Sequence, residues 1–187
     1  MTGLFFGSFN PIHTGHLQIA HYLLEHQLVE KILFVVSPQN PFKRNKELLD
    51  AEKRIELVEK ALARETQMEA CSIELSMPKP SYTIDTLKEL KRRYPSQSFA
   101  LIMGGDNLEN FHLWREHQAI YENYPIFVYP RSGETVRNSN YPNIRPIDAP
   151  LFPVSSTDIR EKIKKGEDIS PFVPAEICNL IRNYYTV

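Results

Sequence analysis

The sequence predicts an α/β protein: a Rossmann-like, doubly wound parallel sheet with helices on both faces and a C-terminal helical segment. The first observation is a short apolar run, 4–6, which is closed by Gly7 and followed by a helical pattern of apolar residues over 17–28. The second is "KILFVVS", 31–37, a β-branched run typical of a strand buried on both faces. Strand, helix and strand in this order form a βαβ unit, and the same alternation continues along the chain.

The later elements follow this alternation. We expect helices over 51–65, 83–94, 107–111, 114–122, 155–166 and 174–186, and strands over 71–75, 98–106 (ending in a glycine turn), 125–131 and 143–150. The expected N-caps are Thr14, Thr83 or Ser81, and Ser156 or Ser155, and Pro174 opens the last helix. A polar, turn-rich insertion over 132–143 is the best candidate for a mobile loop.

Length and composition predict one domain, 1–187, with an ordinary hydrophobic core. Twenty-two Lys and Arg against 23 Asp and Glu give a net charge of -1, which provides no overall field for nucleic acid or an anionic membrane. Cys71 and Cys178 are far apart, which favours reduced thiols and a cytoplasmic protein. We expect no signal peptide and no membrane span, and the sequence leaves a homo-oligomer possible.

Chemically distinctive residues gather just after the predicted strands, at the edge where a doubly wound sheet binds ligands. The segments are "GSFNPIHTGH", "SPQNPFKRN", "GGDN", "PRSG" and "SSTDIR". Together they supply His13, His16, Lys43, Arg44, Asp106, Arg131 and Arg160. Parallel strands end at one edge of the sheet, so we expect these side chains on one rim.

The pair His13 and His16 allows three interpretations. Gly7 and Ser8 permit a sharp turn after the first strand, so both imidazoles lie in the first helical turn, where free amides and the helix dipole attract an anion. A helix cap with ordinary packed histidines is the second interpretation. A zinc site is the third and the least favoured, because no third ligand lies near in the sequence and no HExxH motif is present.

The segment "GSFNPIHTGHL" resembles the (T/S)-x-(H/N)-x-G-H signature of the nucleotidylyltransferase superfamily, in the form typical of bacterial nicotinate-nucleotide adenylyltransferases. Four further segments are similar to motifs of that family: "SPQNPFK", "SYTIDTL", "IMGGDNLENFHLW" and "VSSTDIR". The five occur in the family's order and span residues 3–160, nearly the whole chain. The HxGH element alone is similar to the superfamily, and the five together resemble this one family.

The resemblance implies an adenylyltransferase of NAD biosynthesis that joins ATP to nicotinate mononucleotide and releases pyrophosphate by direct in-line transfer. Mg²⁺ is expected to arrive with ATP, without a metal site of the protein's own. The alternatives are a nicotinamide-nucleotide adenylyltransferase and a non-catalytic nucleotide-binding module. Pantetheine-phosphate adenylyl or cytidylyl transfer fits less well, because those smaller relatives usually lack the "SYTxxTL" and Trp elements.

The resemblance also assigns residues to roles. The expected catalytic residues, which stabilise phosphate charge, are His13, His16, Lys43 and Arg160. The expected ATP-binding residues are Gly7, Ser8, Phe9, His16, Gly104, Asp106, Ser156, Thr157 and Arg160. The expected nicotinate mononucleotide-binding residues are Asn10, Tyr82, Thr83, Trp114 and Arg131.

Several of these residues also have a purely structural interpretation. Asp106 suits the two hydroxyls of a ribose or the N-cap of the next helix, and Trp114 suits a pyridine ring or ordinary packing. Arg131 fits a phosphate contact or a solvated turn. Arg115 stands where an aromatic is common in the family, and Asn10 where Asp is often seen. Arg115 therefore either strengthens the preference for the acid or faces solvent.

Overall fold

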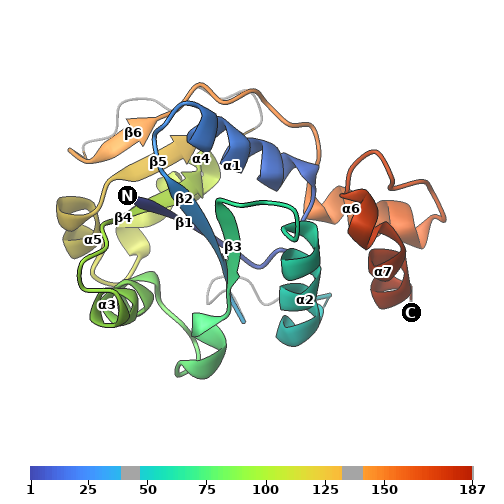
Figure 1. Ribbon diagram of the computed structural model, residues 1–187, viewed down its shortest axis with the longest axis horizontal. Helices are drawn as coiled ribbons and strands as arrows, with labels where there is room; N and C mark the ends of the chain where they lie inside the picture. The colour runs from blue at the N-terminus through green and yellow to red at the C-terminus, as the bar shows by residue number, and fades with distance from the viewer. Residues whose placement is uncertain (39–46, 132–140, 187) are drawn as a thin grey trace.

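The structure, a computed structural model, describes residues 1–38, 47–131 and 141–186 (Figure 1). Its described strands form one parallel sheet in the order β3-β2-β1-β4-β5-β6. The strands are β1 Thr2–Gly7, β2 Lys31–Val36, β3 Met68–Cys71, β4 Phe99–Gly104, β5 Ile126–Tyr129 and β6 Ile144–Pro146. The strand order reverses between β1 and β4, so the carboxyl ends of these two neighbours form the switch point at which sheets of this kind bind ligands. The predicted fold class is confirmed.

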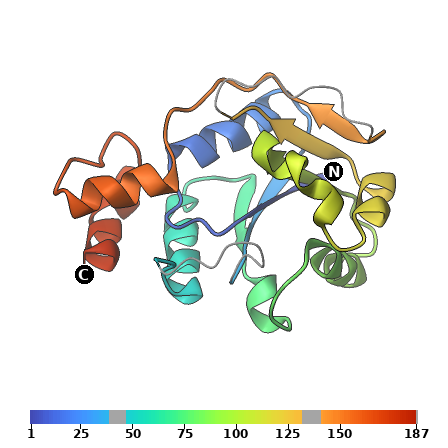
Figure 2. The ribbon, with the colours of Figure 1, turned by 180° about the vertical axis from the view of Figure 1, so that it is seen from behind.

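Helices cover both faces of the sheet. One face carries α1 Thr14–Glu25, α2 Ala51–Ala61, α6 Ser156–Lys164 and α7 Ala175–Tyr185, and the other carries α3 Thr83–Arg93, α4 Gly105–Glu109 and α5 His117–Asn123. Figure 2 shows α6 and α7 gathered at one side of the sheet and α3, α4 and α5 at the other. No helix in the described ranges is long and apolar enough to cross a membrane.

Alternation along the central strands builds two hydrophobic cores. On β1, Phe5 belongs to the core under α1 and α2, whereas its neighbour Leu4 belongs to the core under α3 and α5. Ile102 and Leu101 divide in the same way on β4. All four side chains are at most 2% exposed, because a parallel sheet covered on both faces buries every position of its central strands.

Two sequence predictions about local structure are wrong. The strand predicted over 71–75 lies earlier, at Met68–Cys71, and Ile73–Ser76 forms a 3₁₀ turn. The turn brings the Glu74 carboxylate to two buried hydroxyl groups, those of Ser81 (2.8 Å) and Thr86 (2.7 Å). A continued strand would have to bury this charge differently, and a buried carboxylate without donors is costly.

The second error concerns helix caps. The N-cap of α1 is His13, with an extended backbone, rather than Thr14, whose hydroxyl donates to the Phe172 carbonyl at 3.0 Å. The N-cap of α3 is Tyr82, since the Ser81 hydroxyl is bound to a carboxylate. The Ser155 cap of α6 is confirmed by its 3.1 Å bond from the Asp158 amide. The insertion predicted over 132–143 lies mostly outside the described residues.

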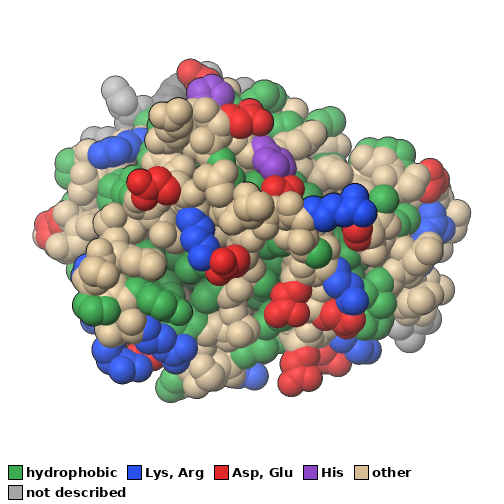
Figure 3. Space-filling model, viewed as in Figure 1, with side chains coloured by type: hydrophobic (Ala, Val, Ile, Leu, Met, Phe, Trp, Pro, Cys, Tyr) green, Lys and Arg blue, Asp and Glu red, His purple; other side chains and the backbone are tan. Residues whose placement is uncertain are grey.

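Charged side chains are mixed over the face seen in Figure 3. Basic groups gather over α3 and acidic groups below α2, and the rest of this face intersperses both signs. This distribution agrees with a net charge of -1, from 22 basic and 23 acidic residues. On the face seen here, attraction of an anionic ligand depends on local arrangement rather than on a broad positive surface.

A fully buried arginine holds the loops that follow β1 and β2. Arg54 on α2 is 0% exposed, and its guanidinium donates to the carbonyls of Ser37 (2.8 Å) and Pro38 (2.9 Å). It also donates to the carbonyls of Ser8 and Leu49. Four carbonyls from three segments thus share one cation, which fixes the backbone at the carboxyl edge of the sheet.

Replacing Arg54 by methionine should destabilise the fold. The substitution preserves much of the side-chain volume but leaves four carbonyls without their donor, so we expect the free energy of unfolding to fall by about 3 kcal/mol or more. Urea unfolding followed by circular dichroism measures the change. The exposed Lys60→Met on the same helix is the control, with an expected change within about 0.5 kcal/mol. A loss below about 1 kcal/mol for Arg54→Met would contradict this role.

Candidate active site

Two histidines, His13 and His16, stand at the start of α1, directly beyond β1. Their rings are stacked with centroids 3.7 Å apart, and the His13 amide donates to His16 Nδ1 at 3.2 Å. A neutral His16 therefore carries its proton on Nε2, which is left to donate to a ligand. Stacked rings do not converge on one metal ion, so this geometry favours hydrogen bonding to an anion.

The glycine between the two histidines is required by close packing. A Cβ atom on Gly15 would lie 3.0 Å from the His13 ring and 3.2 Å from Val154. Phe9, in the turn before the helix, has φ 45° and packs its ring edge-on against His16, with centroids 5.0 Å apart. The turn and the glycine therefore fix where both imidazoles point.

Burial keeps both imidazoles uncharged. His13 is 5% exposed, and its pKa is lowered from 6.5 to about 3, first by desolvation and then by the positive charge of Arg131, while Asp158 opposes the shift. His16 is 8% exposed, and its pKa is also lowered, by desolvation, His13 and Arg131. Near pH 7 the two rings are thus neutral hydrogen-bond donors and acceptors, and nearby arginines supply the positive charge.

Arg160 reaches the histidine turn from α6. It donates to the Asn10 carbonyl at 2.7 Å and to the Thr157 hydroxyl at 3.3 Å, and its Nε lies 3.5 Å from a carboxylate oxygen of Glu47. Its side chain is only 10% exposed. These contacts fix the guanidinium against the turn, and its positive charge therefore lies at a fixed position beside the turn.

Ser156 and Asn10 fasten the same turn to the C-terminal part of the chain. The Ser156 hydroxyl donates to the Pro11 carbonyl at 2.8 Å. The Asn10 side chain accepts from the Tyr185 hydroxyl at 2.7 Å and from the Leu49 amide at 3.1 Å. The polar groups of Ser156 and Asn10 are thus engaged within the protein in this structure.

Two buried polar atoms lack a hydrogen-bond partner. Among the described residues, they are Nδ1 of His13 and Nε of Arg160. Buried polar atoms are rarely left unsatisfied, so each such atom calls for an explanation, and a ligand group is one. Both belong to residues that the sequence assigns to phosphate contacts.

Across the switch point, Asp106 and Arg131 form a second polar group. An Arg131 Nη1 lies 3.4 Å from an Asp106 carboxylate oxygen, and Nη2 lies 3.4 Å from the Tyr129 hydroxyl. Gly104 precedes Asp106, and a Cβ there would lie 2.6 Å from the Asp106 carboxylate. Asp106 is in the first turn of α4, whose N-cap is Gly104, so the alternative prediction of Asp106 as the N-cap is wrong.

A third group is aromatic and lies on the α3 side of the sheet. Trp114 is half-buried and packs edge-on against Phe111, with ring centroids 5.4 Å apart. The Arg115 guanidinium carbon lies 4.1 Å from the centre of the Tyr82 ring, and Thr83 begins α3. No hydrogen bond, ion pair or ring contact between described residues joins this group to the histidines. Lys43 lies outside the described residues.

Three residues that position the site were not predicted from the sequence: Arg54, Glu74 and Tyr185. Arg54 precedes Val58 by one helical turn and so falls on the apolar face of α2, a detectable signal for a buried charge. Glu74 is 2% exposed and fastens the "SYT" segment through Ser81 and Thr86. Nothing in the local pattern marks Tyr185, whose partner is 175 residues away.

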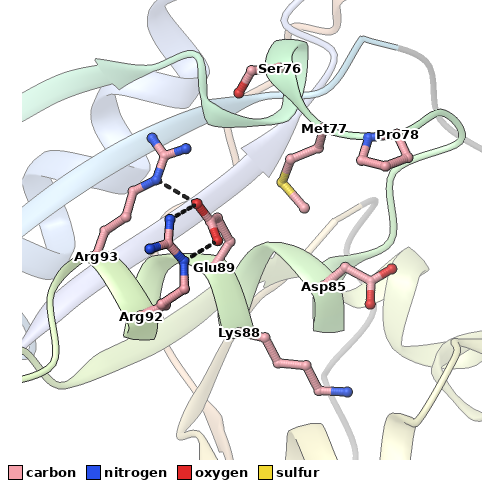
Figure 4. A pocket seen from close by; sticks show the side chains of 8 residues that line it. All are labelled: Ser76, Met77, Pro78, Asp85, Lys88, Glu89, Arg92 and Arg93. Atoms are coloured by element: carbon pink, nitrogen blue, oxygen red, sulfur yellow. Dashed lines mark hydrogen bonds and ion pairs between the residues drawn. The ribbon is translucent and has the colours of Figure 1, made fainter.

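A cavity of about 420 Å³ lies between the 3₁₀ turn and α3, next to the aromatic group through Asp85 (Figure 4). Its charged side chains are paired: Arg92 and Arg93 with Glu89, Lys88 with Glu116, and Asp85 with Arg115. None of the residues assigned to the site from the sequence lines it. The carboxyl edge of the sheet, and not this cavity, is the candidate active site.

The buried histidines should make stability depend on pH. Because folding lowers the His13 pKa from 6.5 to about 3, the unfolded chain binds a proton that the folded protein does not between these pH values. Above pH 6.5 the buried His13 therefore costs no free energy of unfolding. As the pH decreases from 6.5 toward 3, the free energy of unfolding falls by about 1.4 kcal/mol per pH unit because of this residue.

Urea unfolding at pH 7 and pH 5 tests this dependence. From pH 7 to pH 5 the unmodified protein should lose about 2 kcal/mol more than the His13→Gln variant, which has no group to titrate at this position. The exposed His112→Gln is the control and should lose as much as the unmodified protein. Equal losses in His13→Gln and the unmodified protein would contradict a neutral, buried His13.

The chain matches the family model described as "Cytidylyltransferase-like" over residues 4–162. It is 44% identical to a "Probable nicotinate-nucleotide adenylyltransferase" from Flavobacterium johnsoniae, over 98% of this chain and 97% of the relative. A relative of the same name from Bacteroides fragilis is also 44% identical, over 97% of this chain and 91% of its own length.

Solved structures show the same fold at low sequence identity. A Plasmodium falciparum nicotinic acid mononucleotide adenylyltransferase complexed with NaAD is 18% identical with a TM-score of 0.78, over 99% of this chain and 94% of its own. A putative nicotinate-nucleotide adenylyltransferase from Vibrio parahaemolyticus is 20% identical with a TM-score of 0.72, over 98% and 94%. The chain therefore belongs to the cytidylyltransferase-like family and, within it, to the nicotinate-nucleotide adenylyltransferases.

Proposed function

We propose that this chain joins ATP to nicotinate mononucleotide, forming nicotinate adenine dinucleotide and pyrophosphate. A phosphate oxygen of the mononucleotide attacks the α-phosphorus of ATP, and the bond from that phosphorus to the β-phosphate oxygen breaks. Pyrophosphate leaves with both bonding electrons, and no covalent enzyme intermediate forms. Such a transfer asks the protein mainly for positioning and charge stabilisation.

The observation that carries this proposal is a pair of buried nitrogen atoms without a hydrogen bond, His13 Nδ1 and Arg160 Nε, the second of which has only a 3.5 Å ion-pair contact with Glu47. They come from α1 and α6, which meet at the turn after β1, beside the switch point of the sheet. A nucleotide phosphate at this place would satisfy both atoms and meet the uncharged His16 ring. The match to relatives of this activity, at 44% identity over nearly the full chain, supports the same conclusion.

The site residues are proposed to bind different parts of the two substrates. His13 and His16 donate to the α-phosphate, and Arg160 with Lys43 holds the β- and γ-phosphates. Asp106 accepts from the ribose hydroxyls of the adenylate, with Arg131 next to the mononucleotide phosphate. Trp114 presents its free ring face to the pyridine. Half-burial and edge-on packing against Phe111 leave room for that stacking.

We propose that Mg²⁺ enters as part of the ATP substrate, coordinated by triphosphate oxygens and water. The donors at the histidine turn are imidazoles and a guanidinium, which suit phosphate oxygens rather than a hard cation. The carboxylates beside these donors are themselves paired: Glu47 with Arg160 and Lys164, and Asp106 with Arg131 at 3.4 Å. The metal would neutralise charge on the leaving pyrophosphate.

The direct test is pyrophosphate release from Mg²⁺·ATP with nicotinate mononucleotide or with its nicotinamide counterpart. We expect turnover with the acid and a lower kcat/KM with the amide. A higher kcat/KM with the amide would instead identify nicotinamide mononucleotide as the preferred substrate. Nucleotide binding without turnover of either mononucleotide would contradict an enzymatic function and support a non-catalytic nucleotide-binding module.

His16→Ala should lower kcat by about 100-fold, because it removes one donor to the charge that develops in the transition state. His21→Ala, on the same helix and half-exposed beside Glu65, is the control and should stay within about twofold. Steady-state kinetics with varied ATP separates the outcomes. An unchanged kcat with a raised KM for ATP would make His16 a ground-state binding residue instead.

A further inference from the structure

Arg115 is placed at the pyridine end of the proposed site. It directly follows Trp114, and its guanidinium carbon lies 4.1 Å from the centre of the Tyr82 ring. Tyr82 is the N-cap of α3, and that helix start carries no side-chain cap. A cation stacked on an aromatic face is thus held beside free helix amides.

One edge of this guanidinium is engaged and the rest is available. Arg115 Nη1 lies 3.3 Å from an Asp85 carboxylate oxygen, and both side chains are more than 40% exposed. Such an exposed single contact contributes little to stability. Arginine has five N–H donors, and among the described residues only Nη1 of Arg115 has a hydrogen-bond partner. The stack on Tyr82 therefore orients a cation that still has donors for a carboxylate.

Neighbouring charges do not replace this role. On α3, Lys88 lies one turn beyond Asp85, and its Nζ is 3.0 Å from both Glu116 carboxylate oxygens. Lys88 is thus paired with both oxygens of one carboxylate, whereas Arg115 is paired through one nitrogen to one oxygen. The negative charge of Asp85 repels an incoming anion. The Arg115 guanidinium, 3.3 Å away, offsets this repulsion.

We infer that Arg115 is a specificity-determining residue that favours an acid over an amide on the pyridine ring of the acceptor. This inference rests on the proposed function. A carboxylate offers the guanidinium an opposite charge and two acceptor oxygens, whereas a neutral carboxamide offers one acceptor oxygen and must also turn its NH₂ group away. The stack on Tyr82 holds the guanidinium in place before the substrate binds, which reduces the entropy cost of the contact.

Kinetics of variants with both mononucleotides test the inference. Arg115→Gln should lower kcat/KM for the nicotinate form about tenfold and leave the nicotinamide form within about twofold. Arg115→Lys, which retains the charge without the planar stack, should retain more of the acid preference than Arg115→Gln. Lys88→Gln is the matched control and should leave the ratio of the two kcat/KM values unchanged.

Salt provides a second readout that a structural role would not move. Because Arg115 is 54% exposed, its attraction is screened, so the acid-to-amide ratio of the unmodified protein should fall as ionic strength rises. In Arg115→Gln the ratio should be insensitive to salt. Equal losses for both mononucleotides, no change in either, or the same change in Lys88→Gln would overturn the inference.

Direct binding separates this inference from the proposed function. Absence of turnover with either mononucleotide in the unmodified protein counts against the proposed function alone. Calorimetric titration with each mononucleotide then reads Arg115 directly: a tenfold loss of affinity for the acid only, in Arg115→Gln, supports the inference. Equal affinities of the unmodified protein for acid and amide would overturn it.

Discussion

The turn after β1 is held in place by side chains that come from distant parts of the chain. Arg54 on α2 binds the Ser8 carbonyl, and Arg160 on α6 binds the Asn10 carbonyl at 2.7 Å. Ser156 binds the next carbonyl, that of Pro11. Each donor satisfies a backbone group that would otherwise be buried and unpaired. The site therefore exists only when the first strand and the C-terminal helices are assembled together.

In this arrangement, neutral histidines suit their proposed role in a reaction of highly charged substrates. Burial lowers the pKa of His13 to about 3, so the ring adds direction rather than charge. The fixed charge comes from arginines, which remain protonated whatever their surroundings. Arg131 is one of these arginines: its positive charge lowers the pKa of both histidines, and its guanidinium lies 3.4 Å from the Asp106 carboxylate. Charge and direction are thus supplied by different residues.

The sequence predicted the sheet, its helices and the rim because these depend on periodic local patterns. Apolar runs and post-strand turns are visible one element at a time, and parallel strands then bring their ends together. Tyr185 and Arg54 were missed because their partners lie as far as 175 and 46 residues away, and Glu74 because a strand was predicted where its turn forms. Whether His13 or Thr14 caps α1 also depended on a distant group, the Phe172 carbonyl.

Asn10 shows how a departure from a family pattern can have a structural cause. Its Oδ1 accepts from the Leu49 amide and the Tyr185 hydroxyl, while its Nδ2 donates to the Glu47 carbonyl at 3.0 Å. An aspartate could accept the first two bonds but would place a second oxygen against the Glu47 carbonyl. The amide is therefore the group that fits, because its surroundings offer both donors and an acceptor. Its backbone carbonyl meanwhile accepts from Arg160, so one residue joins the C-terminal helix, the loop before α2 and α6.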